Sequence, residues 1–469
     1  MTETEQPTHE AFTTLWMEQA TRSRSPETLR STTQADICVV GGGYTGLWTA
    51  IHVKERRPEL DVCLVEAAVA GAGASGANGG FAMTWWPKFA TLKKLFGSAD
   101  AVYLGQLSEK VVQSIGTYLE KHQIEADFIP SGWLWAATNA TQVGSWDNTI
   151  SQLAAAHQTP YAALPTDEVQ RLTGSAEHLG GVIEGGVATI HPGKFVQGLL
   201  RRALELGVRV YELSPMRRME RRGSFTEVVT TQGRVQATSV VLATNAALGG
   251  IPEIRRNLVI VGSDVVATAP CGDVLAGTSF PNGLAVSDSR RLVHYYRSTS
   301  DDRLVFGKGG GGLSFCGEIG GAATSGPNGR HDAVESHLRR LLPRLSDVPV
   351  THRWSGKIDY SVDGLPFAGR LRSNPSVSYM TGFSGNGVGP AYLAGQVLAS
   401  MALDSDDDWS RLPIIRRPKS SLPPEPFRFV GGNLVRVAMV RQERLQDQGQ
   451  KVDAITRLIT GLDPTSFVG

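Results

Sequence analysis

The fold is decided by residues 36–66, DICVVGGGYTGLWTAIHVKERRPELDVCLVE. An apolar run enters a G-x-G-x-x-G turn, a helical pattern follows and ends near Pro58, and a second apolar run stops at Glu66. Strand, glycine-rich turn, helix, strand and acidic residue, in this order, are the fingerprint of a dinucleotide-binding βαβ unit. The sequence therefore predicts an α/β fold with a dinucleotide site at this turn.

The three glycines of the G-x-G-x-x-G pattern are each required for a physical reason. Gly41 permits the tight turn, Gly43 lets a pyrophosphate approach the backbone, and Gly46 allows the helix to pack closely on the strand. The helix N-terminus offers free N–H groups and positive partial charge to the phosphates. Glu66 is placed to accept hydrogen bonds from a ribose diol. At this point the dinucleotide is open between NAD and FAD.

The composition is that of a globular protein with two domains. The chain has 469 residues, 19% charged and 41% hydrophobic, and its net charge of +1 argues against bulk nucleic-acid binding. Four cysteines form no C-x-x-C and ten histidines no H-E-x-x-H, so neither a metal site nor a disulfide framework is expected. The acidic N-terminus lacks a signal-peptide core and no apolar run could span a bilayer, so we expect a cytoplasmic protein without a membrane span.

Periodicity separates two regions after the βαβ unit. The first continues with helices and short apolar strands, whereas the second, from about 253 to 354, has strands without βαβ rhythm and indicates a largely antiparallel domain inserted in the sequence. The expected helices cover about 101–122, 192–206 and 388–401, and the expected strands lie at 133–135, 208–213, 239–243, 258–261, 292–296 and 303–306, with a hairpin over 227–235.

The two ends of the chain differ from its middle. Residues 1–35 are polar, and we interpret them as an arm on the surface. The tail beyond residue 405 is rich in proline, then helical, with nine Lys/Arg against three Asp/Glu from Arg411 to Lys451. This basic tail could bind an anionic surface or a partner subunit, or could be a cap on its own protein with a solvated basic face. We favour the cap.

Four separated segments, 36–66, 71–80, 360–369 and 382–388, together resemble the D-amino-acid oxidase (glycine oxidase-like) superfamily of FAD-dependent amine oxidoreductases. Gly-Ala-Ser-Gly-x-Asn-Gly-Gly at 73–80 and the first turn are similar to the γ-glutamylputrescine oxidoreductase branch, whose members serve in amine catabolism. The resemblance covers roughly residues 30–405. It implies a discontinuous Rossmann-type FAD-binding domain with an inserted, mainly antiparallel-sheet substrate domain.

The resemblance also implies domain boundaries. The N-terminal arm would be residues 1–35, and the C-terminal basic, proline-rich extension with its helix would be residues 406–469. The FAD-binding domain would comprise 36–88, 188–252 and 355–405, and the substrate domain 89–187 and 253–354.

The same resemblance assigns roles to residues around FAD. Some relatives attach FAD covalently, through a Cys near the third of these segments or a His near the second. Here segment 360–369 has no Cys and segment 71–80 has no His, so FAD would be bound non-covalently. The residues implied for the pyrophosphate and ribose are Gly41, Gly43, Tyr44, Thr45, Gly46, Glu66 and Ala67. Those implied for the loop toward the isoalloxazine are Gly73, Ala74, Ser75, Asn78, Gly79 and Gly80. Those implied for the adenine and ADP side are Met216, Ala243 and Thr244. Those implied near the pyrimidine end are Gly364, Gly385, Asn386, Gly387 and Val388, where a helix N-terminus would stabilise the reduced anionic flavin.

Candidate catalytic residues come from the inserted domain and from Asn386. Period 2 places Tyr295 and Arg297 on one strand face, where Arg297 could clamp a substrate carboxylate or phosphonate and Tyr295 could add a hydrogen bond. The alternative is a strand end with the arginine in solvent and the tyrosine packed. Lys308 or Lys357 could lie near flavin N5 and promote reaction with oxygen. Lys308 could equally be a solvated loop lysine.

The resulting hypothesis is FAD-dependent oxidative deamination of a small primary or secondary (N-alkyl) amine, such as an amino acid or aminophosphonate. A hydride would pass to flavin N5 and the imine would hydrolyse. The partners would be the amine and O2 or another electron acceptor, and a homo-oligomer is compatible with the sequence. The alternatives are a FAD-dependent dehydrogenase of a 2-hydroxy acid, a flavin subunit of a multi-component dehydrogenase, and an NAD(P)-dependent dehydrogenase. The last leaves loops 71–80 and 382–389 unexplained.

Overall fold

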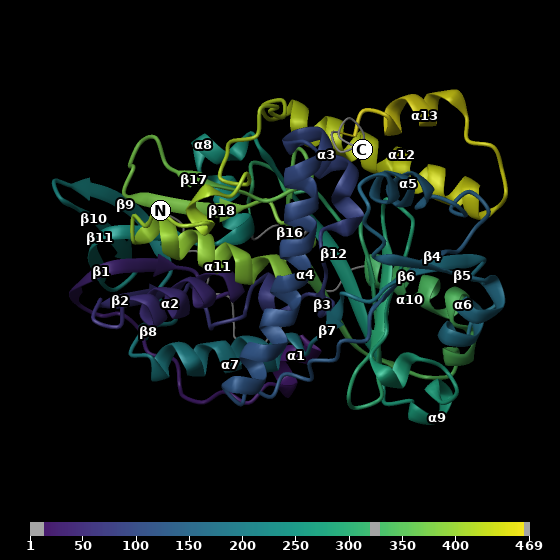
Figure 1. Cartoon of the computed structure of the whole chain (residues 1–469), viewed down its shortest axis with the longest axis horizontal. Helices are drawn as coiled ribbons and strands as arrows, with labels where there is room; N and C mark the ends of the chain where they lie inside the picture. Colours follow the sequence, from purple (N-terminus) through teal and green to yellow (C-terminus); the bar gives the residue numbers. More distant parts are fainter. Residues whose placement is uncertain (1–13, 319–328, 464–469) are drawn as a thin grey trace.

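A computed structural model describes residues 14–318 and 329–463 of the chain. Two large sheets lie side by side along the long axis of the molecule, each with its own helices (Figure 1). The arrangement confirms the predicted α/β fold with an inserted second sheet. The sheets are the basis on which we propose the domain boundaries given above, although one strand, β16 (Val350–Ser361), crosses the boundary proposed at residue 355.

The first sheet has a parallel core. Its order is β17-β18-β11-β1-β2-β8, and β18, β11, β1, β2 and β8 run parallel to their neighbours, as a Rossmann-type sheet requires. The antiparallel hairpin predicted over 227–235 forms between β10 and β11, and β9 extends it. The strands are β1 (Thr32–Val40), β2 (Val62–Val65), β8 (Arg209–Tyr211), β9 (Met216–Arg222), β10 (Phe225–Thr230), β11 (Arg234–Leu242), β17 (Phe367–Arg370) and β18 (Val377–Thr381).

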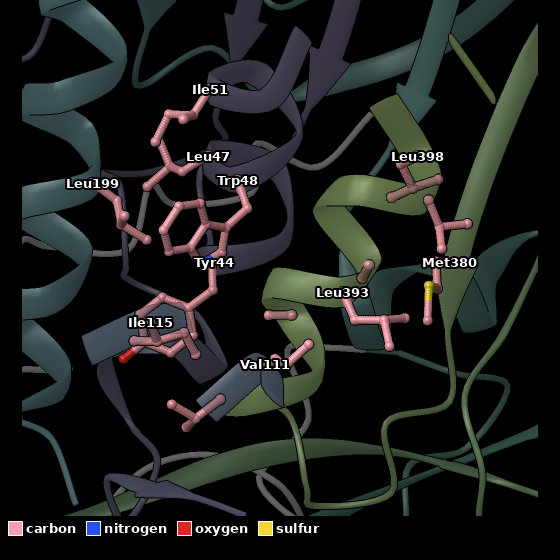
Figure 2. Packing of buried hydrophobic residues seen from close by; sticks show 14 of the residues in the cluster. Tyr44, Leu47, Trp48, Ile51, Val111, Ile115, Leu199, Met380, Leu393 and Leu398 are labelled. Carbon is pink, nitrogen blue, oxygen red and sulfur yellow. The ribbon is translucent and has the colours of Figure 1, made fainter. Parts of the chain in front are cut away.

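Three helices from distant parts of the chain cover one face of this sheet. These are α2 (Tyr44–Arg56), α7 (Pro192–Glu205) and α11 (Val388–Ala402), and Figure 2 shows their apolar side chains meeting around Trp48. A Cβ on Gly395 of α11 would lie 2.5 Å from the Cβ of Trp48, so only glycine allows α11 to approach α2 this closely. The first glycine-rich turn and the last one are thereby held on one packed core.

The second sheet is mainly antiparallel. Its order is β16-β12-β15-β14-β13-β4-β6-β5, and only the β13–β4 pair is parallel. The strand predicted at 258–261 runs on to Thr268, because β16 and β15 pair with it on both sides and carry it past the polar residues Ser263 and Asp264. The remaining strands are β4 (Trp133–Ala137), β5 (Tyr161–Leu164), β6 (Gly180–Glu184), β12 (Leu258–Thr268), β13 (Ala285–Asp288), β14 (His294–Ser298) and β15 (Leu304–Lys308), with the short pair β3 (Phe81–Ala82) and β7 (Ala188–Thr189) outside the sheet.

Further helices surround the second sheet and its junction with the first. The long α4 (Ser98–Lys121) packs against α11, and α10 (Gly329–Leu341) packs on β12. The others are α3 (Phe89–Phe96), α5 (Asp147–Ala155), α6 (Thr166–Thr173), α8 (Pro252–Arg255) and α9 (Gly272–Leu275). No helix in the two described stretches combines the length and the apolar character that crossing a bilayer requires.

The N-terminal arm differs from our expectation. Within its described part, Leu15 and Trp16 of α1 (Leu15–Gln19) are buried, and the Trp16 indole N–H donates to the carbonyl of Asn78 at 2.8 Å. The expectation of a surface arm is therefore wrong for this segment, because two large apolar side chains in a polar stretch find a place in the core. Residues 1–13 lie outside the described residues.

The C-terminal extension forms α12 (Phe427–Asp447) and α13 (Ala454–Thr460), which lie over the second sheet (yellow in Figure 1). Ion pairs from Asp447 to Arg290 (2.6 Å) and from Glu443 to Lys308 (3.4 Å) hold α12 down. The tail thus lies on its own protein, although its outer face carries exposed Val430 and Val437 besides basic residues.

Candidate functional site

One cavity of about 1330 Å³ runs between the two sheets. Residues at the C-terminal edge of the parallel strands line one end, loops 71–79 and 383–388 line the middle, and strands of the second sheet with α12 line the other end. Ligands of open α/β sheets bind at this edge of the parallel strands. The cavity is therefore where the sequence motifs and the inserted sheet come together.

The first turn has the geometry of a phosphate site. Gly41 has φ +114°, and a Cβ there would lie 2.5 Å from the Ala243 carbonyl oxygen. A Cβ on Gly46 would lie 1.9 Å from the oxygen of Gly41. Gly43 is the N-cap of α2 and supplies no side-chain cap, while the N–H of Tyr44 donates to Ser75 Oγ at 2.9 Å. The next N–H groups of α2 are left for a ligand, which suits an anion.

Glu66 directly follows β2 and lines the cavity, as the fingerprint predicts. Its carboxylate accepts from the N–H groups of Gly42 (2.6 Å) and Ala68 (2.9 Å), which fix its orientation. Burial raises the pKa of this carboxyl group, and the two backbone donors oppose the rise. A ribose diol would supply hydrogen-bond donors to the same carboxylate.

The loop at 71–80 holds its own shape through Asn78. The Asn78 amide donates to the carbonyls of Ala74 (3.1 Å) and Ser75 (2.8 Å) and accepts from the N–H of Gly80 (2.8 Å). A Cβ on Gly79 would lie 2.8 Å from the Tyr295 ring, so the loop passes directly against β14 of the second sheet. Small residues here leave room for a flat ring beside the backbone.

The turn before α11 closes the middle of the cavity. The Asn386 amide donates to the carbonyl of Thr84 at 3.0 Å, and the residue lines the cavity. Its Oδ1 is buried and has no hydrogen-bond partner among the residues that the structure describes. The N-cap of α11, Gly387, has no side chain to cap the helix. An unpartnered acceptor beside open helical N–H groups fits the donor and acceptor edge of a flavin pyrimidine ring.

Most residues predicted to bind the cofactor line this one cavity. Three predicted residues, Gly46, Gly80 and Gly364, do not line it and stand behind the lining. The predicted residues in the lining are Gly41, Gly43, Tyr44, Thr45, Glu66, Ala67, Gly73, Ala74, Ser75, Asn78, Gly79, Met216, Ala243, Thr244, Gly385, Asn386, Gly387 and Val388.

Tyr295 lies in the cavity and Arg297 does not. The Tyr295 hydroxyl is 3.0 Å from Ser263 Oγ, and burial raises the pKa of this phenol to about 12, so the hydroxyl keeps its proton at neutral pH. The Arg297 guanidinium donates to the carbonyls of Gly79 (3.1 Å) and Ile190 (2.7 Å) and stacks 5.2 Å above the Trp16 ring. Arg297 braces the flavin loop from behind, and the predicted clamp on a substrate anion does not match this position.

Lys308 also differs from prediction. It is the last residue of β15, is mostly buried, and donates to the Leu292 carbonyl (3.2 Å) besides pairing with Glu443. It lies neither in the cavity lining nor in a solvated loop, because α12 covers it. The other candidate, Lys357, does line the cavity, and partial burial lowers its pKa.

Several residues of the site were not found from the sequence. Lys88 lines the cavity near Gly364, whose Cβ position lies 3.6 Å from the lysine Nζ, and burial lowers the pKa of this lysine. Glu184 on β6 is buried beside the cavity wall, where the Thr84 hydroxyl donates to it and burial raises its pKa to about 7. Arg436 and Met439 of α12 line the end of the cavity that lies over the second sheet. The apolar spacing of the tail helix predicted that one of its faces is buried. The neighbouring sequence did not indicate which part of the protein that face would cover.

Comparison with known proteins agrees with this site. The profile of the family described as FAD dependent oxidoreductase (DAO) matches residues 36–401. Gamma-glutamylputrescine oxidoreductase of Escherichia coli (strain K12) is 30% identical over 414 residues, which cover 88% of this chain and 91% of that protein. Probable oxidoreductase OrdL of Haemophilus influenzae is 29% identical over 386 residues, with 80% and 84% covered.

Solved structures share the fold. Glycine oxidase from Geobacillus kaustophilus matches with a TM-score of 0.67 at 20% identity, covering 82% of this chain and 100% of that one. L-proline dehydrogenase from P. horikoshii matches with a TM-score of 0.63 at 19% identity, covering 83% and 96%. At these identities the likeness concerns the architecture, and it confirms the predicted combination of a Rossmann-type domain and an inserted sheet domain.

Proposed function

This chain belongs to the DAO family of FAD-dependent oxidoreductases, and on that premise we propose that it oxidises a small primary or secondary amine. One observation carries the proposal: loops 71–80 and 382–388, far apart in the sequence, line one cavity together with Tyr295 of the inserted sheet, and Asn386 bonds to Thr84 just beyond the first loop. The cavity offers a long site for FAD and a compartment beyond it. The 30% identity to gamma-glutamylputrescine oxidoreductase supports an amine as the substrate.

The chain's own residues would hold FAD along this cavity. The open N–H groups of α2 suit the pyrophosphate, Glu66 the ribose, and the N-terminus of α11 with Asn386 the pyrimidine edge. When bound, FAD supplies the acceptor for a hydride from the carbon that carries the amine, and the imine then hydrolyses. Tyr295, fixed by Ser263, presents a protonated hydroxyl to the substrate compartment. The apolar walls align the neutral amine and exclude water.

The electron acceptor is part of the same proposal. Lys357 lines the cavity, and partial burial lowers its pKa. We propose Lys357, in place of Lys308, as the lysine that favours O2 as the acceptor. A Lys357→Met variant that loses reaction with O2 but keeps reduction by substrate would support this assignment.

The experiment is an anaerobic titration of the purified protein. We expect a yellow protein whose FAD is released intact by acid, since the described site offers no cysteine for attachment in the third motif. Primary amines, N-methyl amines and aminophosphonates should bleach the flavin absorbance, whereas 2-hydroxy acids should not. Bleaching by hydroxy acids alone would replace the amine proposal, and activity that appears only after a second protein is added would indicate a subunit of a larger dehydrogenase.

A further inference from the structure

The C-terminal extension is a fixed wall of the cavity. Gly432, Val435, Arg436 and Met439 lie on the inward side of α12 and line the compartment beyond loop 71–80. The other end of α12 is anchored by Asp447, which pairs with Arg290 (2.6 Å) and Arg340 (3.1 Å). A helix tied down in this way can present a side chain to a substrate at a constant position.

Four arginines line the cavity, and three of them are neutralised by acidic side chains. Arg290 pairs with Asp288 at 2.7 Å and also with Asp447. Arg291 pairs with Asp463 at 3.5 Å, and Arg428 pairs with Glu425 at 2.6 Å. None of these three needs a ligand to balance its charge.

Arg436 is the exception. Among residues 14–318 and 329–463 it has no ion pair, and its one hydrogen bond, from Nη1 to the carbonyl of Gly310, is long at 3.4 Å. Its Nε is buried and has no partner within the same ranges. A cation partly removed from water without a counter-ion is unfavourable, and a ligand anion would offset that cost.

The place of Arg436 separates it from the phosphate site. Gly310 is followed by Gly311, whose N–H donates to the carbonyl of Gly262 at 3.0 Å, and Gly262 stands opposite Lys357 in the second sheet. Arg436 therefore stands over the second sheet, whereas the open N–H groups of α2 belong to the first. An anion at Arg436 belongs to the substrate, because the dinucleotide phosphates have their own site.

We propose that Arg436 binds an anionic group of the substrate, so that the preferred substrates are amines that also carry a carboxylate or phosphonate. The inference rests on the proposed amine oxidation. The two Nη groups of the guanidinium can bind two oxygens of such a group side by side, a geometry that a lysine does not reproduce. The role expected of Arg297 thus passes to a residue that lies outside the matched family region and comes from the tail.

The test uses dead-end ligands, so that it does not depend on turnover. Butyrate, propylphosphonate and the neutral butyramide are titrated into the FAD-loaded full-length protein by calorimetry, and the flavin absorbance change is followed in parallel. We expect both anions to bind more tightly than butyramide. Arg436→Gln should weaken the anions about 10- to 100-fold and leave butyramide unchanged, and Arg436→Lys should fall between.

A matched control is Arg441→Gln on the outer face of α12, where Arg441 is exposed and pairs with Asp453. It should leave all three affinities unchanged. Equal binding of butyrate and butyramide to the wild type, or anion affinity that survives in Arg436→Gln, would overturn the inference. Thermal unfolding of each variant identifies a folding defect. If Arg436→Gln is defective, the anion affinities of Arg436→Lys decide the test, because lysine keeps the charge and an aliphatic stem.

Substrates separate this inference from the proposed function. In anaerobic bleaching, 4-aminobutyrate and 5-aminovalerate should reduce the flavin at lower concentration than butylamine, and Arg436→Gln should raise KM for the amino acids with little change in kcat. If butylamine and the amino acids react equally, amine oxidation stands and the inference fails. If no amine reacts but anions still bind through Arg436, the site stands and the proposed reaction fails.

Discussion

Asn386 donates a hydrogen bond to the carbonyl oxygen of Thr84 at 3.0 Å, across 302 positions of the chain. This bond joins the segment that follows the flavin loop to the turn that opens α11. It leaves Oδ1 of Asn386 buried at the cavity, without a partner in the described part of the chain. Loops 71–80 and 382–388 both line this cavity and together form one cradle. We propose that the free acceptor of the Asn386 amide binds the cofactor.

Replacing Asn386 should weaken FAD binding. Asn386→Ala removes the bond to Thr84 and the free acceptor, each of which contributes about 1 kcal/mol. We expect the Kd for FAD to rise about tenfold or more, measured by quenching of flavin fluorescence. Asn386→Asp keeps the acceptor but loses the donor and should lie between. Unchanged FAD affinity in Asn386→Ala would show that the two loops are held together by other contacts.

Glycines inside and outside the cradle should respond in different ways to alanine. Gly46→Ala places a methyl group 1.9 Å from the Gly41 oxygen, so the phosphate turn must shift and FAD should be lost. Gly250 does not line the cavity, and no atom of the described residues lies within 4 Å of its Cβ position. Gly250→Ala should keep FAD with near wild-type affinity. The flavin-to-protein absorbance ratio of the purified variants, with circular dichroism as a check on folding, distinguishes the two.

Arg297→Gln should destabilise the protein and loosen FAD without a specific effect on anionic substrates. The guanidinium is buried and donates to Gly79 and Ile190 carbonyls, so its loss should cost about 3 kcal/mol and lower the midpoint of thermal unfolding. Arg353→Gln is the control, because Arg353 is exposed and pairs with Glu335. An exposed ion pair of this kind contributes less than about 1 kcal/mol to the free energy of unfolding. A rise in KM for amino acids alone, with unchanged stability, would instead revive a clamp role for Arg297.

Glu184 should make stability depend on pH. Burial raises its native pKa to about 7, whereas the unfolded carboxyl titrates near 4.5. Below pH 4.5 both states hold the proton. Between 4.5 and 7 only the native state holds it, so stability falls as the pH rises. Glu184→Gln has no titrating group here, so its unfolding free energy should rise relative to that of the wild type between pH 4.5 and 7. The difference should reach about 3 kcal/mol above pH 7.

Urea unfolding of both proteins at pH 5 and pH 8 measures the effect. The difference in unfolding free energy between Glu184→Gln and the wild type should be small at pH 5 and large at pH 8. A difference that is equal at the two pH values would mean that Glu184 is ionised throughout this range.

Local motifs could be predicted because their conformation is set by neighbours in the chain. The positive φ of Gly41, the uncapped N-terminus of α2 and the carboxylate of Glu66 all follow from a run of about thirty residues. The helices over 101–122 and 192–206 follow from apolar spacing in the same way and are confirmed as α4 and α7. The strand predicted at 133–135 is confirmed as β4, and its Trp133 and Trp135 stack on one face with ring centroids 5.5 Å apart.

The substrate-binding residues could not be predicted, because the period-2 pattern of a strand shows which side chains share a face but not which residues pack against that face. Tyr295 and Arg297 share a face of β14, yet Tyr295 lies in the cavity while Arg297 reaches Ile190 and Trp16, which come from distant segments. Lys308 became buried because α12 covers it with Glu443. None of these partners is near in sequence, so no local pattern carries the information.

The sequence by itself determined the dinucleotide turn, the α/β class and the order of the glycine-rich loops, because backbone conformation at glycines and helix ends depends on adjacent residues. Only the tertiary structure decided that Arg297 braces a loop, that Lys308 anchors the tail, and that Arg436 lies in the cavity wall. Whether a charged side chain binds a ligand or stabilises the fold depends on which distant groups neutralise it, and packing alone brings those groups together.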